Sequence, residues 1–200
     1  MGSPALRISN IVMGRQNEGQ RVSYLVAPDG NGQARATPET VVLKRWRQRR
    51  MEGYTFSGSR LSPTVWRAIA FAFPEFLLDA AFPLLDGIGL RIQATDVALK
   101  RRHLSLPSEE VLRALLLDLG PDRLRRLIDR HTSEAHKGKS GVPDLYLFAH
   151  SGHSSEEPSF SRFVEVKEPK EPVSTSQHAE IAFMQELGLQ VRVLKLIERQ

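Results

Sequence analysis

The sequence predicts an α/β fold, a mixed β-sheet flanked by helices, with most of the helices in the N-terminal half of the chain. Three observations favour this class. Apolar residues recur at helical spacing through residues 37–131, and Glu165 and Lys167 alternate with Val164 and Val166 as in a strand. A capped helical segment then leads to a final apolar strand, and such a crossover is what two parallel strands need.

The length of 200 residues and the absence of cysteine fit one core-forming domain without disulfides or thiolate zinc sites. We expect an N-terminal extension over residues 1–36 and a domain over residues 37–200. Within that domain, residues 37–135 form the helical part and residues 140–198 the strand-rich part.

No membrane span is expected, because charged residues and prolines interrupt the longest apolar stretch, residues 65–85. The first residues also lack the pattern of a secretory signal. We therefore expect an intracellular protein, located in the nucleus if the source is eukaryotic and in the cytoplasm if it is bacterial or viral.

The first 36 residues show no sustained period, and we expect one strand there, at residues 22–26. Thr37, Pro38 and Glu39 have the features of a helix start: a cap, a proline at the first helical position and an acid near the positive end. The apolar stripe of this helix consists of Val42, Leu43 and Trp46.

A second helix is predicted to begin at Ser62 and Pro63 and to be kinked by Pro74. Its core-facing residues at helical spacing are Val65, Trp66, Ile69, Phe73, Phe76 and Leu77. After an expected loop from Phe82 to about Leu106, a short helix capped by Ser108 ends at Gly120.

Pro121 then opens another helix, with its arginines outward and its apolar side chains, Leu124, Leu127 and Ile128, inward. We expect these helices to form one wall of a channel for nucleic acid.

Charged residues stand on two strands that we expect to pair. Asp144 precedes the apolar run 145–149, and a loop separates this run from Glu165 and Lys167, which share one face of their strand. Such charges on a half-buried surface cost several kcal/mol unless they are paired or bind a cation. A divalent metal would draw the two carboxylates together, with Lys167 ready to face an anion. The alternative is a solvated strand face that carries a Glu/Lys pair.

The segment after this strand predicts a helix followed by a last strand. Ser174 is the expected cap and Gln177 its capping-box partner, while Gly188 ends the helix. The final strand covers residues 190–197, with Val191 and Val193 facing one way.

The net charge of +5 suits a polyanionic partner. The basic residues are clustered, which favours nucleic acid over the alternative of ordinary solvated surfaces. The clusters are Lys44, Arg45, Arg47, Arg49 and Arg50; Lys100, Arg101, Arg102 and His103; Arg123, Arg125, Arg126 and Arg130; and Lys137 and Lys139.

These motifs resemble a known family. GVPDL at 141–145, VEVKEP at 164–169, VSTSQ at 173–177 and GLQVRV at 188–193 are similar to the VRR-NUC domain of the PD-(D/E)xK superfamily. Within it, EGYTFS at 52–57 before an aromatic helix resembles the Fanconi-associated nuclease family. The resemblance implies a restriction-endonuclease-like fold. The sequence departs from the family pattern at Glu168, where glycine is usual, and at Glu180, where an aromatic residue is expected.

Carried over residue by residue, the resemblance implies that Glu52, Asp144 and Glu165 hold Mg²⁺ or Mn²⁺, with the carbonyl of Val166 as a further ligand. It implies that Lys167 is the catalytic lysine. Gln177 matches a glutamine that lies beside the active site in the family, although a capping box alone would also explain it.

The expected function is a metal-dependent, structure-specific DNA nuclease that hydrolyses phosphodiesters near 5′ ends, flaps or junctions, in DNA repair or recombination. The metal would stabilise charge on the phosphoryl oxygens and lower the pKa of an attacking water. The alternatives are a catalytically silent nucleic-acid-binding module, and a structural or toxin-associated interaction protein with a fortuitous motif.

Overall fold

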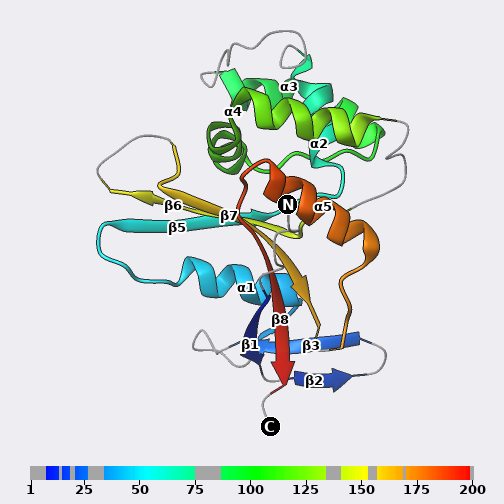
Figure 1. Ribbon diagram of the computed structural model, residues 1–200. Helices are drawn as coiled ribbons and strands as arrows, with labels where there is room; N and C mark the ends of the chain where they lie inside the picture. Colours follow the sequence, from blue (N-terminus) through cyan, green and yellow to red (C-terminus); the bar gives the residue numbers. More distant parts are fainter. Residues whose placement is uncertain are drawn as a thin grey trace.

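The computed structural model describes residues 8–13, 15–18, 21–26, 34–74, 87–133, 141–152, 157–168 and 170–198. Its main feature is a five-stranded mixed sheet of order β1-β8-β7-β6-β5 (Figure 1). The strands are β1 (Ile8–Met13), β5 (Tyr54–Arg60), β6 (Leu145–Ser151), β7 (Phe160–Lys167) and β8 (Val191–Glu198). β1 and β7 run parallel to β8, whereas β6 is antiparallel to both β5 and β7. The predicted mixed sheet is confirmed.

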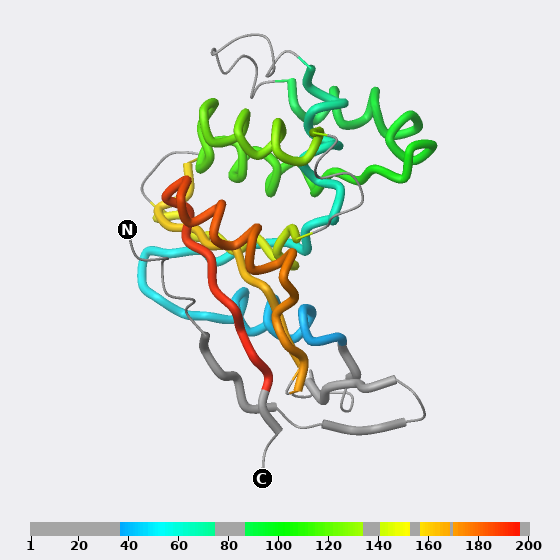
Figure 2. The backbone as a smooth tube through the Cα atoms, turned by 45° about the vertical axis from the view of Figure 1, so that its right-hand side comes forward, coloured from blue at the N-terminus to red at the C-terminus, as the bar shows by residue number. Residues whose placement is uncertain are grey.

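Helices cover both faces of this sheet, which separates two apolar cores (Figures 1 and 2). The helices are α1 (Pro38–Arg47), α2 (Val65–Ala72), α3 (Ile88–Arg101), α4 (Glu109–Thr132) and α5 (Thr175–Glu186). Alternate residues of β7 belong to the two cores: Phe163 packs with α2, α4 and α5, and Val164 packs with α1. The period-two pattern therefore places Glu165 and Lys167 on the α5 face. Among the described helices, none is both long and apolar enough to cross a membrane.

The N-terminal residues contribute more strands than the one expected. The predicted strand at 22–26 is β3 (Arg21–Val26), and it pairs with β2 (Arg15–Glu18) and β4 (Ala34–Ala36) in a separate three-stranded sheet. β1 was not predicted; it forms an edge of the main sheet beside β8. Strands that pair over such a long sequence distance leave no local signal beyond a short apolar run.

Helix α1 begins as predicted and is fixed to the sheet by its tryptophan. Thr37 caps it, and Pro38 is its first residue. The Nε1 of Trp46 donates hydrogen bonds to the carbonyls of Ser57, at 2.8 Å, and Phe148, at 3.1 Å. The C-terminal end of the helix is thereby held against β5 and β6.

The predicted kink at Pro74 is instead a helix end. α2 stops at Ala72, and Phe73 leaves the helical region with φ −134° and ψ 62°. This is the preference of a residue before proline, whose ring crowds the helical conformation. The expected helical residues Phe76 and Leu77 lie outside the described part of the chain.

The expected loop from Phe82 to Leu106 was wrong, because α3 occupies residues 88–101. Only Ile88 and Leu99 of this helix are buried, whereas Leu90 and Val97 are exposed, so its apolar residues form no clear stripe.

The two helices expected on either side of Gly120 are present as the two halves of α4. Gly120 has φ 65° and ψ 172°, which breaks the helix, and Pro121 opens the second half. Leu124, Leu127 and Ile128 are buried as predicted.

Candidate active site

Asp144 and Glu165 are brought together by the pairing of β6 with β7. β6 begins directly after Asp144, and its first residue, Leu145, pairs with Val164. Continuing this antiparallel register by one residue places Asp144 opposite Glu165. The carbonyl of Asp144 also accepts a hydrogen bond from the N–H of Leu61 at 2.8 Å, which fixes it at the end of β5.

Lys167 lies beside Glu165 on the same face of β7, and both side chains are buried. The Nζ of Lys167 lies 3.0 Å from Glu165 Oε1 and donates to Glu171 Oε1 at 2.6 Å. Burial lowers the pKa of Lys167, but the hydrogen bonds to Glu171 and Glu165 outweigh it, and the pKa is raised. The lysine is therefore held as a cation in the site.

The two carboxylates are both destabilised as anions. Burial raises the pKa of Asp144, the charge of Glu39 adds to the rise, and the N–H of Val166 opposes it. Burial and the charge of Asp144 raise the pKa of Glu165 to about 7, against the lowering effect of Lys167. A cation bound between these acids would relieve their mutual repulsion.

The backbone of Val166 points toward Asp144. Its N–H donates a hydrogen bond of 2.8 Å to Asp144 Oδ2. The N–H and C=O of one strand residue point to the same strand edge, so the Val166 carbonyl also faces this edge, beyond the start of β6. The geometry thus leaves the carbonyl available as the oxygen ligand that the family resemblance implies.

Gln177 both caps α5 and contacts the site. Its N–H and side-chain Oε1 form the predicted capping box with Ser174. At the same time its Nε2 donates a hydrogen bond to Glu165 Oε1. Gln177 therefore forms the predicted capping box and also contacts Glu165, so α5 is tied to the acid that it covers.

Glu52 lies away from these residues, which corrects its assignment as a metal ligand. It is exposed in the turn before β5, next to Gly53, whose carbonyl accepts a hydrogen bond from Gly152. Asp144 is instead beside Leu61, just beyond the other end of β5. Seven strand residues at about 3.3 Å each separate the two ends by roughly 20 Å, too far for a shared metal ion.

Glu39 is a further acid near Asp144, although its place in the sequence predicted only a helix start. Its charge contributes to the raised pKa of Asp144. Its Oε2 lies 3.3 Å from Nη2 of Arg60, yet this buried oxygen has no hydrogen-bond partner, because the ion pair lacks hydrogen-bond geometry. The only sequence signal for Glu39 was an acid in the first turn of α1, which helix electrostatics already explained.

The donor atoms of these residues suit a hard divalent cation. Asp144, Glu165 and the Val166 carbonyl supply oxygen ligands, and Glu39 adds a carboxylate oxygen without a hydrogen bond. In the described residues, no three side chains of Asp, Glu, His or Cys already converge to hold a metal ion. The donors that could share one ion are therefore the carboxylates of Asp144 and Glu165 and the Val166 carbonyl, with Glu39 and Glu171 nearby.

A second buried acid, Glu180, links α5 to α4. Its Oε2 accepts from Arg130 Nε, and its Oε1 lies within hydrogen-bond distance of His131 Nε2, both at 2.7 Å. Burial raises the pKa of Glu180, but His131 and Arg130 outweigh it, and the pKa is lowered. A side chain on Gly141 would collide with Ser176 and Glu180, so the helix packs directly on the segment before Asp144.

The model of the VRR-NUC domain family matches residues 91–196, slightly more than half of the chain. The chain belongs to the VRR-NUC domain family. The matched residues include Asp144, Glu165 and Lys167 but not Glu39.

Two solved structures of paFAN1 resemble this VRR-NUC protein in fold. One is bound to 1-nt 5′ flap DNA with a gap (15% identity, TM-score 0.58), and the other to 2-nt 5′ flap DNA with a gap (16% identity, TM-score 0.59). Each match covers the whole of this chain and 39% of the paFAN1 chain. The restriction-endonuclease-like α/β fold is thereby confirmed. Comparison with curated proteins finds no match.

Proposed function

We propose that this VRR-NUC protein is a metal-dependent, structure-specific DNA nuclease that acts inside the cell in DNA repair or recombination. The observation that carries the proposal is the meeting of Asp144, Glu165 and Lys167 at the junction of β6 and β7, with the Val166 carbonyl at the same edge. Two acids, a backbone oxygen and a lysine suit the hydrolysis of a phosphodiester.

Asp144, Glu165 and the carbonyl of Val166 would hold Mg²⁺ or Mn²⁺. When bound, the ion would stabilise negative charge on the phosphoryl oxygens and lower the pKa of an attacking water. Lys167 then faces the phosphoryl oxygens as a fixed positive donor, and Gln177 holds the Glu165 carboxylate in orientation. Since Glu171 also accepts a hydrogen bond from Lys167, binding of a phosphate to this lysine exchanges one anionic partner for another.

The substrate that we propose is DNA with a 5′ end, flap or junction. Supporting it, the paFAN1 structures are bound to 5′ flap DNA, and this chain carries a net charge of +5. Because the chain spans 39% of the paFAN1 length, the choice among DNA structures is part of the proposal. Arg123 and Arg126 are exposed on α4 and provide phosphate-binding charge outside the acidic site.

The test is incubation with labelled flap, splayed, nicked and four-way DNA, with and without Mn²⁺. We expect cleavage near a branch or 5′ end that requires Mn²⁺ and is absent in Asp144→Ala. Cleavage without any divalent ion, or cleavage retained by Asp144→Ala, would refute the proposed site.

A catalytically silent DNA-binding module is the second candidate. It is favoured by the absence, in the described residues, of three side chains that converge on one metal position. This candidate predicts salt-dependent DNA binding that Mn²⁺ leaves unchanged, with no cleavage of any of the four substrates.

A further inference from the structure

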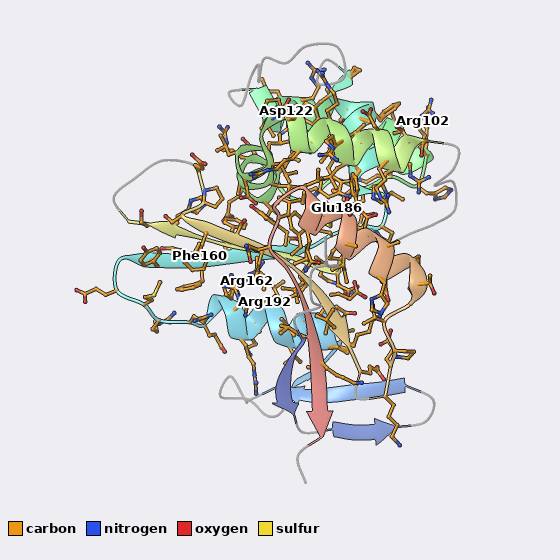
Figure 3. All side chains as sticks on the ribbon, viewed as in Figure 1. Arg102, Asp122, Phe160, Arg162, Glu186 and Arg192 are labelled. Atoms are coloured by element: carbon orange, nitrogen blue, oxygen red, sulfur yellow. The ribbon has the colours of Figure 1, made fainter. Side chains whose placement is uncertain are left out.

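A pocket of about 330 Å³ lies between α1 and the sheet. Four arginines and an apolar floor line it: Val42, Arg45, Trp46, Arg49, Leu147, Arg162, Val164, Arg192 and Leu194. Val164 belongs to the α1 face of β7, whereas Glu165 and Lys167 belong to the α5 face. The pocket is therefore separate from the candidate active site. Figure 3 shows Arg162 and Arg192 together on the side of the sheet where α1 lies.

Strand pairing brings the arginines together. Arg192 of β8 is the partner of Val164 in the parallel register, and Arg162 is two residues before Val164 on the same face of β7. Arg49 approaches from the end of α1. In the described part of the chain, none of Arg49, Arg162 and Arg192 forms an ion pair with a carboxylate. Burial and the charges of Arg192 and Arg49 lower the pKa of Arg162.

Trp46 orients two of these guanidinium groups. The Cζ atoms of Arg49 and Arg162 each lie 5.2 Å from the centre of its ring, within the range of a cation–π contact. The ring itself is fixed through its hydrogen bonds to the carbonyls of Ser57 and Phe148. The positive groups are thus positioned before any ligand arrives, which reduces the entropy lost on binding.

Like charges gathered on a partly buried surface are unfavourable unless an anion joins them. Guanidinium groups bind phosphate oxygens in a bidentate way, so phosphate is the matching anion. The floor between the arginines is apolar, with Val42, Leu147 and Leu194, and suits an uncharged ring attached to that phosphate. A volume of about 330 Å³ is at the lower end of the range for ligand sites, which fits one small ligand.

We propose that this pocket binds a single nucleotide unit, with its phosphate on Arg49, Arg162 and Arg192 and its sugar and base against the apolar floor. The unit has two possible sources, a free mononucleotide or one nucleotide of a single DNA strand. Both present the same chemistry to the pocket.

Binding is measured by calorimetry and by thermal shift, in EDTA, so that the result does not depend on cleavage. The probes are thymidine 5′-monophosphate, thymidine, inorganic phosphate and a short oligothymidylate. Arg162→Gln and Arg192→Gln are compared with the parent and with Arg67→Gln, which alters an exposed arginine of α2 outside the pocket. Circular dichroism verifies that each variant is folded.

We expect the monophosphate to bind the parent and Arg67→Gln equally, and each pocket variant at least tenfold more weakly. Thymidine alone should bind far more weakly than its monophosphate. A preference for the monophosphate over the oligonucleotide would identify a free nucleotide as the source, and the reverse preference would identify a DNA strand; either supports the proposal.

Three results would overturn it: no binding of either nucleotide probe, binding unchanged in both folded pocket variants, or equal affinity for inorganic phosphate and the monophosphate. Because EDTA removes divalent ions, none of these results bears on whether the protein cleaves DNA.

Discussion

Gln177 donates a hydrogen bond from Nε2 to Glu165 Oε1, while its Oε1 accepts the N–H of Ser174 at 2.9 Å. One amide group therefore joins the first turn of α5 to the acid at the centre of the site. The position of the helix and the orientation of the carboxylate are coupled through this side chain, as for residues that support metal ligands.

Replacement of Gln177 tests this coupling. Gln177→Ala removes the orienting hydrogen bond, and we expect cleavage to fall by about 10–100-fold, with loss of Mn²⁺ affinity. Ser174→Ala is the matched control, because it removes the hydroxyl that accepts the N–H of Gln177 but keeps the contact with Glu165. It should lower the free energy of unfolding by about 1 kcal/mol and leave cleavage within a few-fold of the parent. Equal losses of activity in the two variants would show that the glutamine acts only through the helix.

Glu39 and Glu52 form a second pair of variants. We expect Glu39→Gln to reduce cleavage at least tenfold, because its charge acts on Asp144 and its Oε2 has no hydrogen bond. Glu52→Gln should cleave like the parent, since that side chain is exposed near the far end of β5. Initial cleavage rates at saturating Mn²⁺ measure the effect of each of these two variants. The opposite order of effects would restore Glu52 as the third acid.

Variants of Asp144 and Lys167 should distinguish the loss of metal binding from the loss of cleavage alone. A ligand that binds only the native state raises the melting temperature, so we expect Mn²⁺ to raise the melting temperature of the parent. Asp144→Ala should lose both the rise and cleavage, because it removes a ligand. Lys167→Ala should keep the rise and lose cleavage, because it removes a positive donor. If Asp144→Ala is stabilised by Mn²⁺ as strongly as the parent, the metal binds elsewhere.

The buried acid Glu180 predicts a dependence of stability on pH. Its folded-state pKa is lowered below the ordinary value of 4.5, so its stabilising contribution is present above that value and is lost as pH falls through the folded pKa. Glu180→Gln should therefore cost roughly 2–3 kcal/mol at pH 7, as for a charged hydrogen bond that is removed.

Urea unfolding at pH 7 and at pH 3.5 measures this effect. The difference between parent and Glu180→Gln should shrink at the lower pH, because the unfolded parent takes up a proton at Glu180 below about 4.5, whereas the folded parent resists it. Arg130 and His131 are the groups that face this carboxylate. A difference that is equal at both pH values would contradict the assignment.

The second half of α4 predicts salt-dependent DNA binding. Arg123→Glu with Arg126→Glu should weaken binding to every DNA structure alike and reduce the slope of log affinity against log salt by about one per lost phosphate contact. Asp122→Lys, at an exposed neighbour, should strengthen binding on the same helix. Arg130 is left unchanged in this test, because it forms an ion pair with the buried Glu180. Unchanged binding in all variants would place the DNA elsewhere.

The central acids could be predicted from the sequence because their signals are local. Asp144 precedes an apolar run, and Glu165 and Lys167 alternate with valines. Only a loop separates the two segments, which leaves antiparallel pairing as the simplest connection. The acid that α1 brings near Asp144 could not be predicted in this way. Whether Glu39 or Glu52 approaches Asp144 depends on how α1 packs on the sheet, and Trp46 fixes that through carbonyls distant in sequence.

The difference between local signals and contacts distant in sequence also explains which parts of the fold could be predicted. The capping box of α5 and the break at Gly120 were predictable because each is encoded within a few residues. α3 was missed since it buries little, with Leu90 and Val97 exposed, so no amphipathic period marks it. Glu180 was noted only as a departure from a family pattern, and its ion pair with Arg130 spans fifty residues.

The pairing of β1 with β8 has a practical consequence for any shortened version of the protein. Removal of residues 1–36 would strip β8 of its outer neighbour and uncover a row of free N–H and C=O groups along a strand of eight residues. An uncovered edge of this kind recruits strands from other molecules. A fragment that starts at residue 37 would therefore retain Asp144, Glu165 and Lys167, yet would tend to self-associate through β8.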